Sequence, residues 1–486
     1  MKGSKLLDIL STFSKKEMKS FEKLISSPYA KIERDVTGLF DILKEYYPDF
    51  EDSNLEKEKI YKILSPGENF NSKKLTNIAA ELTRLAEKFL VYEHIDSDAF
   101  DYERFLSIQY LDRKKEKLFS RSIRALEKKI EGSLIDSVDL FSREEKVVRL
   151  KEEYHIMRND FDNAMAARRQ YDEYITLSFL VIFLRSMRNK LQVKDIHKGS
   201  PDSMLFDTMS GNIDFENLLD ELKKSKYPDL WIVELYYCCF LCTRYPDDDA
   251  SFRKFMKLFY DNMNKFSHRE KYFLFCDIVS FCIRNENRGN TSYAREEMKV
   301  YKTMMEKEIF TSSEKDYMSL MLFRNAMLLA ISLREYEWLD KFIDNYSVRL
   351  KPDYVDNMRV FARAHLDFEL GNFEAALDNI TKIKYDLFAY KIDVKNLFLK
   401  VFYELELFDQ AFSMVDTYKQ YLKNNQEFSP AYKLQFKNFN KLYLKLLKAR
   451  ADNKHSGLDN LADEINSTET LSTRSWLLEK INEMKK

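Results

Sequence analysis

Apolar residues recur along the chain at intervals of three and four, the spacing that places side chains on one face of an α-helix. The clearest instance is the segment 370–383, LGNFEAALDNITKI, whose apolar positions fall at offsets of 0, 3, 4, 7 and 10 from Phe373. Most or all of these offsets recur in six segments, which start at residues 215, 252, 294, 336, 373 and 408. We therefore predict six amphipathic helices that share one register.

The separation of these segments supports the fold prediction, because any single amphipathic helix shows such offsets. Successive starts lie 35 to 42 residues apart, and a second apolar segment lies between each pair, as at 230–242 and 394–407. Helix pairs at this period are typical of an α-solenoid, in which each pair buries its apolar face against its neighbours. The sequence thus predicts an all-α protein, built as an α-solenoid of irregular helix pairs with an N-terminal helical domain.

Changes in the pattern divide the chain into four predicted parts. Residues 1–95 form an N-terminal helical domain, whose helices are separated by proline-containing breaks. Residues 96–195 form long charged helices, for which divergent repeats are one interpretation. The segment 194–212 collects Gly, Pro, Ser and Asp and predicts a break. Helical repeats at 213–448 and capping helices at 456–486 follow.

The composition supports a helical protein and argues against several other classes. The chain has nine glycines and eight prolines among 486 residues, too few for the many tight turns of a β-protein or for glycine-rich phosphate loops. Hydrophobic residues make up 45%, which excludes global disorder. The formal net charge of -1 gives the whole protein no field that attracts nucleic acid or an anionic membrane.

Three further features predict a cytoplasmic protein. The longest apolar run, 174–184, has 11 residues, whereas a membrane-spanning helix needs about 20. The N-terminal segment has only a short apolar patch, so we expect no secretory signal. The five cysteines lie within helical patterns, which fits a reducing compartment better than a set of disulfides.

The segment 362–380, ARAHLDFELGNFEAALDNI, resembles a tetratricopeptide repeat (TPR). Ala364 stands at the small position of the first helix and Gly371 at the turn. Phe373 stands at the aromatic position, and Ala376 at the close-packed start of the second helix. The resemblance implies TPR-like helix pairs in this part of the chain.

Other positions depart from that pattern. Arg363 and Asp367 stand where apolar residues are usual, and the following unit has Glu406 in place of the turn glycine. The whole chain also resembles a family of uncharacterised bacterial proteins, through segments near both ends such as 11–29 and 473–481. That second resemblance implies no activity.

The TPR resemblance implies a non-enzymatic scaffold or adaptor for protein-protein interaction. In such arrays the first helix of each pair lines a concave groove that holds a protein or peptide partner. Carried over position by position, this geometry predicts nine residues that face the partner: Arg324, Leu328, Phe361, His365, Phe368, Glu369, Asn396, Lys400 and Tyr403.

No set of residues predicts catalysis, a bound cofactor or a metal ion. Cys238, Cys239 and Cys242 lie close together on one predicted helix. Because they stand among aromatic residues, without the turns of a zinc knuckle, we interpret them as core residues, and a redox pair of Cys239 and Cys242 is the weaker alternative. The six histidines are scattered and form no H-E-x-x-H motif.

One alternative function remains open from the sequence. The segment 113–129 carries eight basic and two acidic residues, enough for a basic stripe on a helix. The protein would then be a nucleic-acid-associated regulator that uses this helix together with the N-terminal domain. Solvated helix faces in lysine-rich proteins have the same composition, so a protein partner remains the preferred prediction.

Overall fold

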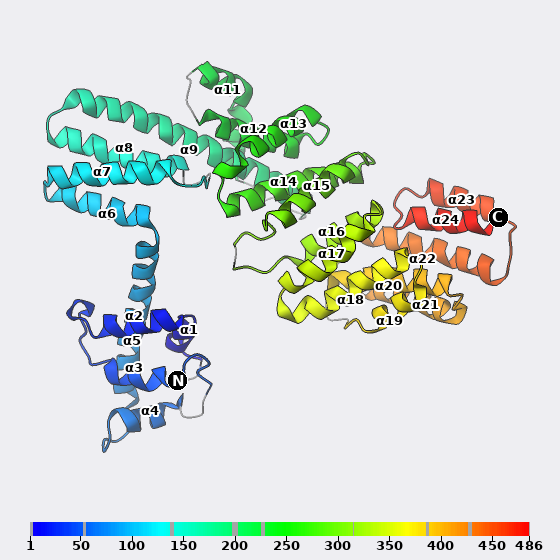
Figure 1. Ribbon diagram of the computed structural model, residues 1–486, viewed down its shortest axis with the longest axis horizontal. Coiled ribbons are helices and arrows are strands. Elements are labelled where there is room, and N and C mark those ends of the chain that lie inside the picture. The colour runs from blue at the N-terminus through cyan, green and yellow to red at the C-terminus, as the bar shows by residue number, and fades with distance from the viewer. Residues whose placement is uncertain are drawn as a thin grey trace. The chain divides into compact units, whose positions relative to one another are not determined.

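The computed structural model describes residues 3–51, 55–136, 140–196, 203–224, 229–313, 315–384, 388–425 and 430–485 (Figure 1). These residues form α-helices joined by turns and contain no β-strand, so the predicted all-α class is confirmed. The chain divides into two compact units, Met1–Ile182 and Phe183–Lys486. None of the helices in the described ranges is both long and apolar enough to cross a membrane. Part of the predicted break, residues 197–202, lies outside the described residues.

The first unit begins with a helical bundle around one apolar core. Its longest helix, α5, packs against α1, α2, α3 and α4. Leu10, Phe21, Phe40 and Leu82 are fully withdrawn from solvent in this core. The bounds of the five helices are α1 (Lys5–Ser11), α2 (Lys15–Ile25), α3 (Thr37–Lys44), α4 (Lys57–Leu64) and α5 (Ser72–Ser97).

A reciprocal cap fixes the start of α2. The backbone N–H of Glu17 donates to Ser14 Oγ at 3.2 Å, and the N–H of Ser14 donates to Glu17 Oε2 at 2.6 Å. This capping box satisfies two backbone donors that would otherwise lack partners at the helix start. The helix then buries Met18, Phe21 and Ile25, which lie at intervals of three and four.

The rest of the first unit consists of long helices with a core of their own. Leu126 is fully buried there, beside Ile123 and Val147. Phe119 stacks on Tyr154 with ring centroids 4.8 Å apart. The helices are α6 (Ala99–Asp112), α7 (Glu116–Glu131), α8 (Leu140–Met157) and α9 (Phe161–Ile196), of which α9 continues into the second unit.

The second unit contains all six helices that the periodicity predicts. They are α11 (Phe215–Lys224), α13 (Asp249–Asn262), α15 (Tyr293–Glu306), α17 (Tyr336–Tyr346), α19 (Phe373–Thr381) and α21 (Phe408–Asn424), each beginning within three residues of its predicted start. The helices between them are α12 (Leu230–Arg244), α14 (His268–Asn287), α16 (Leu320–Ser332), α18 (Pro352–Glu369) and α20 (Phe388–Glu404). The remaining helices are α10 (Met204–Asn212), α22 (Pro430–Ala451), α23 (Leu458–Ser467) and α24 (Arg474–Met484).

Each helix in this series packs on the next, and some also contact the helix after that. The pairs α12 with α14, α16 with α18, and α18 with α20 are in contact. In these three pairs, side chains of alternate helices therefore share a surface. This arrangement is typical of helical repeats, whose units bury their apolar faces against neighbours in the sequence.

One turn conformation recurs between paired helices. Arg334, Gly371 and Glu406 all have positive φ, of 58°, 81° and 55°. In each case the next residue donates its N–H to a carbonyl five residues earlier, at 2.8 to 2.9 Å, which is the Schellman motif that ends a helix. Glu406, which departs from the expected glycine, therefore adopts the same left-handed conformation.

The same turn occurs in the first unit. Lys114 and Asn159 have positive φ, and Lys115 and Asp160 donate the corresponding hydrogen bonds at 2.9 Å. These turns join α6 to α7 and α8 to α9. The fold is therefore all-α and repeat-like, with one type of helix-helix turn in both units.

Candidate functional site

A cavity of about 540 Å³ lies among α16, α18, α20 and α22. Each helix contributes side chains at intervals of three or four, because that spacing keeps them on one face. Six of the nine residues predicted to face a partner line this cavity: Arg324, Leu328, His365, Glu369, Asn396 and Lys400. The sequence analysis missed eight lining residues, from α16, α20, α22 and the segment before α24: Ile331, Asp393, Leu397, Tyr432, Gln435, Phe436, Ser472 and Thr473.

Asn396 supplies a preoriented donor in this cavity. The side chain is only 8% exposed, and its Oδ1 accepts a hydrogen bond from the Tyr418 hydroxyl at 2.9 Å. That bond orients the amide and leaves its Nδ2, which lines the cavity, as a donor with no partner among the described residues. A ligand that accepts a hydrogen bond from this oriented donor gains from it.

Lys400 lies one helical turn after Asn396 and is the least compensated charge in the cavity. Its Nζ lies 5.6 Å from the centroid of the Phe368 ring and 5.8 Å from that of Trp476. It has no hydrogen bond or ion pair with the described parts of the chain. Burial lowers the pKa of Lys400, although Glu369, Glu479 and Glu404 favour the charged form from a distance.

The other basic residue of the cavity has a carboxylate beside it. Arg324 donates from Nε and Nη2 to the two oxygens of Asp393, at 2.5 and 2.8 Å. This bidentate pair fixes the guanidinium and neutralises its charge. Lys400, rather than Arg324, therefore supplies the positive charge available to a ligand.

His365 is a neutral member of the lining. Burial, together with the positive charges of Lys400 and Arg324, lowers the pKa of His365 to about 3. Its Nε2 is buried without a hydrogen-bond partner among the described residues. The imidazole packs edge-on against Phe361, with the ring centroids 4.7 Å apart. It is thus uncharged at neutral pH and fixed in place by its neighbours.

Three residues predicted to face the partner lie in the core instead. Phe361, Phe368 and Tyr403 are 1%, 7% and 0% exposed. Phe361 supports His365, and Phe368 supports Lys400, so both lie behind lining residues. The predicted direct contact is therefore corrected for all three: Phe361 and Phe368 support lining residues, and Tyr403 packs against Trp476 with ring centroids 5.3 Å apart.

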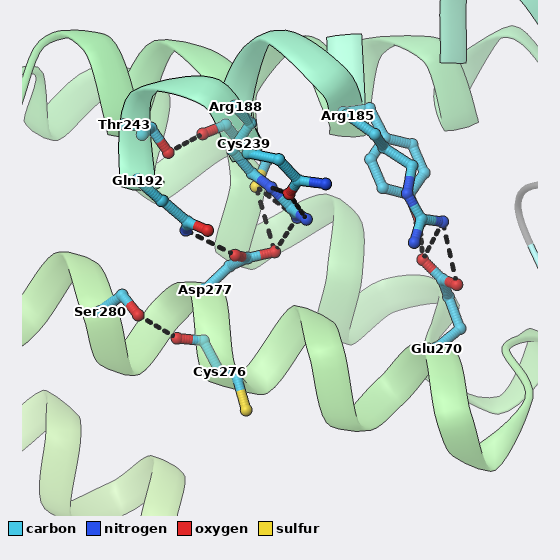
Figure 2. A network of polar contacts seen from close by, with 11 residues as sticks. Arg185, Arg188, Gln192, Cys239, Thr243, Glu270, Cys276, Asp277 and Ser280 are labelled. Atoms are coloured by element: carbon cyan, nitrogen blue, oxygen red, sulfur yellow. Dashed lines mark hydrogen bonds and ion pairs between the residues drawn. The ribbon is translucent and has the colours of Figure 1, made fainter. Parts of the chain in front are cut away.

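A second polar cluster, in α9, α12 and α14, is internally paired (Figure 2). Arg188 forms an ion pair with Asp277, and both side chains are only 9% exposed. Gln192 donates to the other oxygen of Asp277 at 3.3 Å, and Cys239 Sγ lies 3.5 Å from Asp277 Oδ2. This cluster joins three helices through groups that satisfy one another.

A second ion pair lies beside it. Arg185 Nη1 donates to both oxygens of Glu270, at 3.2 and 3.3 Å, and the Tyr236 hydroxyl donates to the same carboxylate (Figure 2). The arginine also lies over the Tyr236 ring. Both pairs therefore join the part of α9 after Ile182 to α12 and α14 within the second unit.

The cysteines are packed as core residues. Cys238, Cys239, Cys242 and Cys282 are buried, and burial raises the pKa of all four thiols, that of Cys238 to about 11. Protonated thiols are poor nucleophiles and poor metal ligands. Within the described ranges, no three His, Cys, Asp or Glu side chains cluster in a way that could hold a metal ion.

A pair of carboxyl groups lies between α14 and α15. Burial raises the pKa of Glu297 to about 8, and a hydrogen bond with Glu286 contributes to the shift. Burial also raises the pKa of Glu286. Two acids that share a buried site without a cation hold a proton between them at neutral pH.

Comparison of the chain with family models, with curated proteins and with solved structures gave no match. The TPR resemblance therefore stays a prediction, and any function has to be argued from the geometry of the chain itself.

Proposed function

We propose that this protein is a cytoplasmic, non-enzymatic interaction scaffold, built as a TPR-like α-solenoid, that holds a segment of a partner protein in the cavity among α16, α18, α20 and α22. The central support is the pair of adjacent donors Asn396 and Lys400, which lack acceptors among the described residues. An acidic side chain of the partner would supply the missing acceptor for both.

The rest of the lining suits a peptide better than a small anion. Leu328, Leu397 and Phe436 add apolar surface beside the donors, and Glu369 adds an acceptor. A peptide segment brings apolar side chains, N–H donors and carbonyl acceptors together, so it matches this mixture. The proposed ligand is therefore an acidic residue flanked by apolar residues.

The protonation states argue against proton-transfer chemistry in this cavity. With a pKa of about 3, His365 is too weak a base to accept a proton efficiently near neutral pH. Arg324 stays charged and paired with Asp393. These groups are arranged to bind and orient a ligand.

Site-specific photocrosslinking in cells tests this proposal. A photoreactive residue at Gln435, which lines the cavity, should give one major adduct, whereas the same residue at Leu434, its exposed neighbour outside the lining, should not. Lys400→Met should weaken the Gln435 adduct at least tenfold. The control Lys441→Met removes an exposed charge on α22 and should leave the adduct unchanged. Equal adducts at both positions, or full crosslinking in Lys400→Met, would contradict the proposal.

A second candidate function rests on the surface of α7. Lys117, Arg121, Arg124 and Lys128 are all exposed, and their spacing of four, three and four places them on one stripe about 17 Å long. None of the four has an acidic partner among the described residues. Such a stripe suits the phosphate backbone of a nucleic acid.

The salt dependence of binding tests this second candidate. Contact with four phosphates predicts that log K falls with log salt with a slope of about -3 to -4. Arg121→Glu with Arg124→Glu should abolish binding to DNA or RNA. The matched change Lys437→Glu with Lys448→Glu, at exposed positions of α22, should not. Absence of retention by the unmodified protein at low salt would exclude this function for α7.

A further inference from the structure

A stripe of exposed residues runs along α9 in the first unit. Its members alternate in spacing between four and three, which is the a and d pattern of a coiled-coil seam. They are Phe161, Met165, Arg168, Asp172, Ile175, Phe179 and Ile182. The buried face of α9 is a different one, formed by Ala164, Ala167, Leu177 and Leu180.

The degree of exposure makes this stripe unusual. Its five apolar members expose between 40% and 63% of their surface. Arg168 and Asp172, at its centre, expose 52% and 60% of their side chains. Large apolar side chains that lie in a continuous row on a surface mark an interaction site.

Six of the seven members of the stripe, all but Ile182, are arranged symmetrically about position 170. Residues at equal distances from position 170 match in kind: Phe161 with Phe179 at nine positions, and Met165 with Ile175 at five. The third pair, Arg168 and Asp172, lies two positions on either side of residue 170, and its members carry opposite charges. In each matched pair one residue is at a d position and the other at an a position.

We infer that two copies of this chain associate through antiparallel packing of α9 about a two-fold axis at residue 170. An isologous interface requires a surface complementary to itself, in which residue i meets residue j and j meets i. In an antiparallel coiled coil, a positions of one helix meet d positions of the other. Phe161 then meets Phe179 of the second copy, and Met165 meets Ile175.

The charged pair fixes the direction of the helices. The antiparallel arrangement places Arg168 against Asp172 of the second copy, twice per dimer. A parallel arrangement would place Arg168 against Arg168 and Asp172 against Asp172, which is repulsive. In the single chain Arg168 pairs with Asp172 at 3.2 Å along the same helix and with Glu152 of α8 at 3.7 Å, so the dimer exchanges ion pairs within one chain for a pair between two chains.

The stripe favours a second copy over other partners. A lipid surface would force the central charges into an apolar medium, at a high cost. An unrelated partner gives no reason for the symmetry about position 170. The matched part of the stripe, Phe161 to Phe179, spans 18 residue steps, or about 27 Å of helix, so we expect a modest interface and a dimer that dissociates on dilution.

Sedimentation of the full chain over a concentration series tests this inference. The unmodified protein should move from its chain mass of 58.2 kDa toward twice that value as concentration rises. Met165→Glu, which faces Ile175 of the second copy, should raise the dissociation constant at least tenfold. Met321→Glu changes an exposed methionine of α16 and should leave the dissociation constant unchanged.

Charge exchange at the centre tests the assigned geometry. Arg168→Asp and Asp172→Arg should each abolish the dimer, whereas the double variant should restore it. A mixture of the two single variants should form a heterodimer, because one chain then presents two acids to the two bases of the other. Circular dichroism shows whether each variant keeps its helix content.

Three results would overturn the inference. A chain that stays monomeric up to high concentration has no such interface. A dimer that tolerates Met165→Glu and both single charge changes uses another surface. Failure of the double variant to recover, with both single variants dissociated, would reject the antiparallel register about residue 170.

Discussion

Arg188 is a buried basic side chain and Lys400 is a half-buried one, and they differ in what lies beside them. Arg188 meets the carboxylate of Asp277, and although burial acts against its charge, that carboxylate raises the pKa of Arg188 above its usual range. Lys400 meets two aromatic rings and no carboxylate within bonding distance among the described residues, and burial lowers its pKa.

The difference separates structural polar groups from groups available to a ligand. A buried charge with a partner is costly to disturb, because removal of one member leaves the other uncompensated. A buried charge without a partner is costly as it stands, and a ligand can relieve that cost. The Arg188 cluster is accordingly a structural joint, and the Lys400 cavity is the better candidate for binding.

The largest expected effect comes from breaking the paired cluster. Asp277→Ala leaves the Arg188 guanidinium buried without its carboxylate, and we expect a loss of about 3–5 kcal/mol of stability. Hydrogen exchange of α12 and α14 as a function of denaturant would measure this loss in the second unit.

The control for that variant replaces both charged side chains of the cluster with apolar ones. Arg188→Met together with Asp277→Leu removes both charges, so it should cost less than about 1–2 kcal/mol, or stabilise the unit. A double variant as unstable as Asp277→Ala would show that the joint depends on hydrogen bonds of Gln192 and Cys239 rather than on the ion pair.

The carboxyl pair of Glu286 and Glu297 is a third kind of buried ionisable site, in which a bound proton removes the negative charge. Because the pKa of Glu297 is raised to about 8 in the folded protein, the stability it contributes is complete below about pH 4.5 and is lost as pH rises through 8. Glu297→Gln should therefore remove about 2–4 kcal/mol of pH dependence between pH 5 and pH 9. Denaturation midpoints of both proteins over this range would measure it. Parallel pH profiles would contradict the buried, protonated state of the pair.

The helices were predictable because their pattern depends on local chemistry. Apolar spacing placed the starts of α11, α13, α15, α17, α19 and α21 within three residues. The common turn was only partly predictable from the sequence. Gly371 indicates a left-handed backbone conformation, whereas Arg334 and Glu406 adopt the same conformation although neither is a glycine. Packing of the flanking helices selects that conformation, and sequence alone does not show packing.

The helix face that lines the cavity could be predicted from the sequence, but the individual side-chain contacts could not. Asn396 and Lys400 were predicted to lie on this face because the first helices of repeat pairs were expected to share a surface, and both residues line the cavity. Phe361 and Tyr403 were misplaced because a helix of this array is covered on two sides, so aromatic residues near the predicted face turn into the core. The contribution of Gln435 was missed, although the left-handed turn at Asn453 marks 430–451 as the first helix of another pair.

The smallest expected effect is a gain of stability. It tests whether Lys400 is a structural residue or a charge available to a ligand. Lys400→Met keeps the length of the side chain and its contact with Phe368, and removes the uncompensated ammonium, so we expect the protein to gain about 1–2 kcal/mol of stability. The pKa of Lys400 is lowered in the folded protein, so its burial costs stability in full below that pKa. This cost fades as pH rises toward the unfolded value of about 10.4, so the gain should fade with it.

The same substitution at a paired lysine should act in the opposite direction. Lys480 is 7% exposed and lies 2.9 Å from carboxylate oxygens of both Glu404 and Glu483. Lys480→Met leaves Glu404 buried without its cation, so we expect a loss of about 1–3 kcal/mol. Denaturation midpoints of the two variants measure both effects on one scale. If Lys400→Met destabilised the protein as Lys480→Met does, Lys400 would be a structural residue. The main argument that the cavity binds a ligand would then fail.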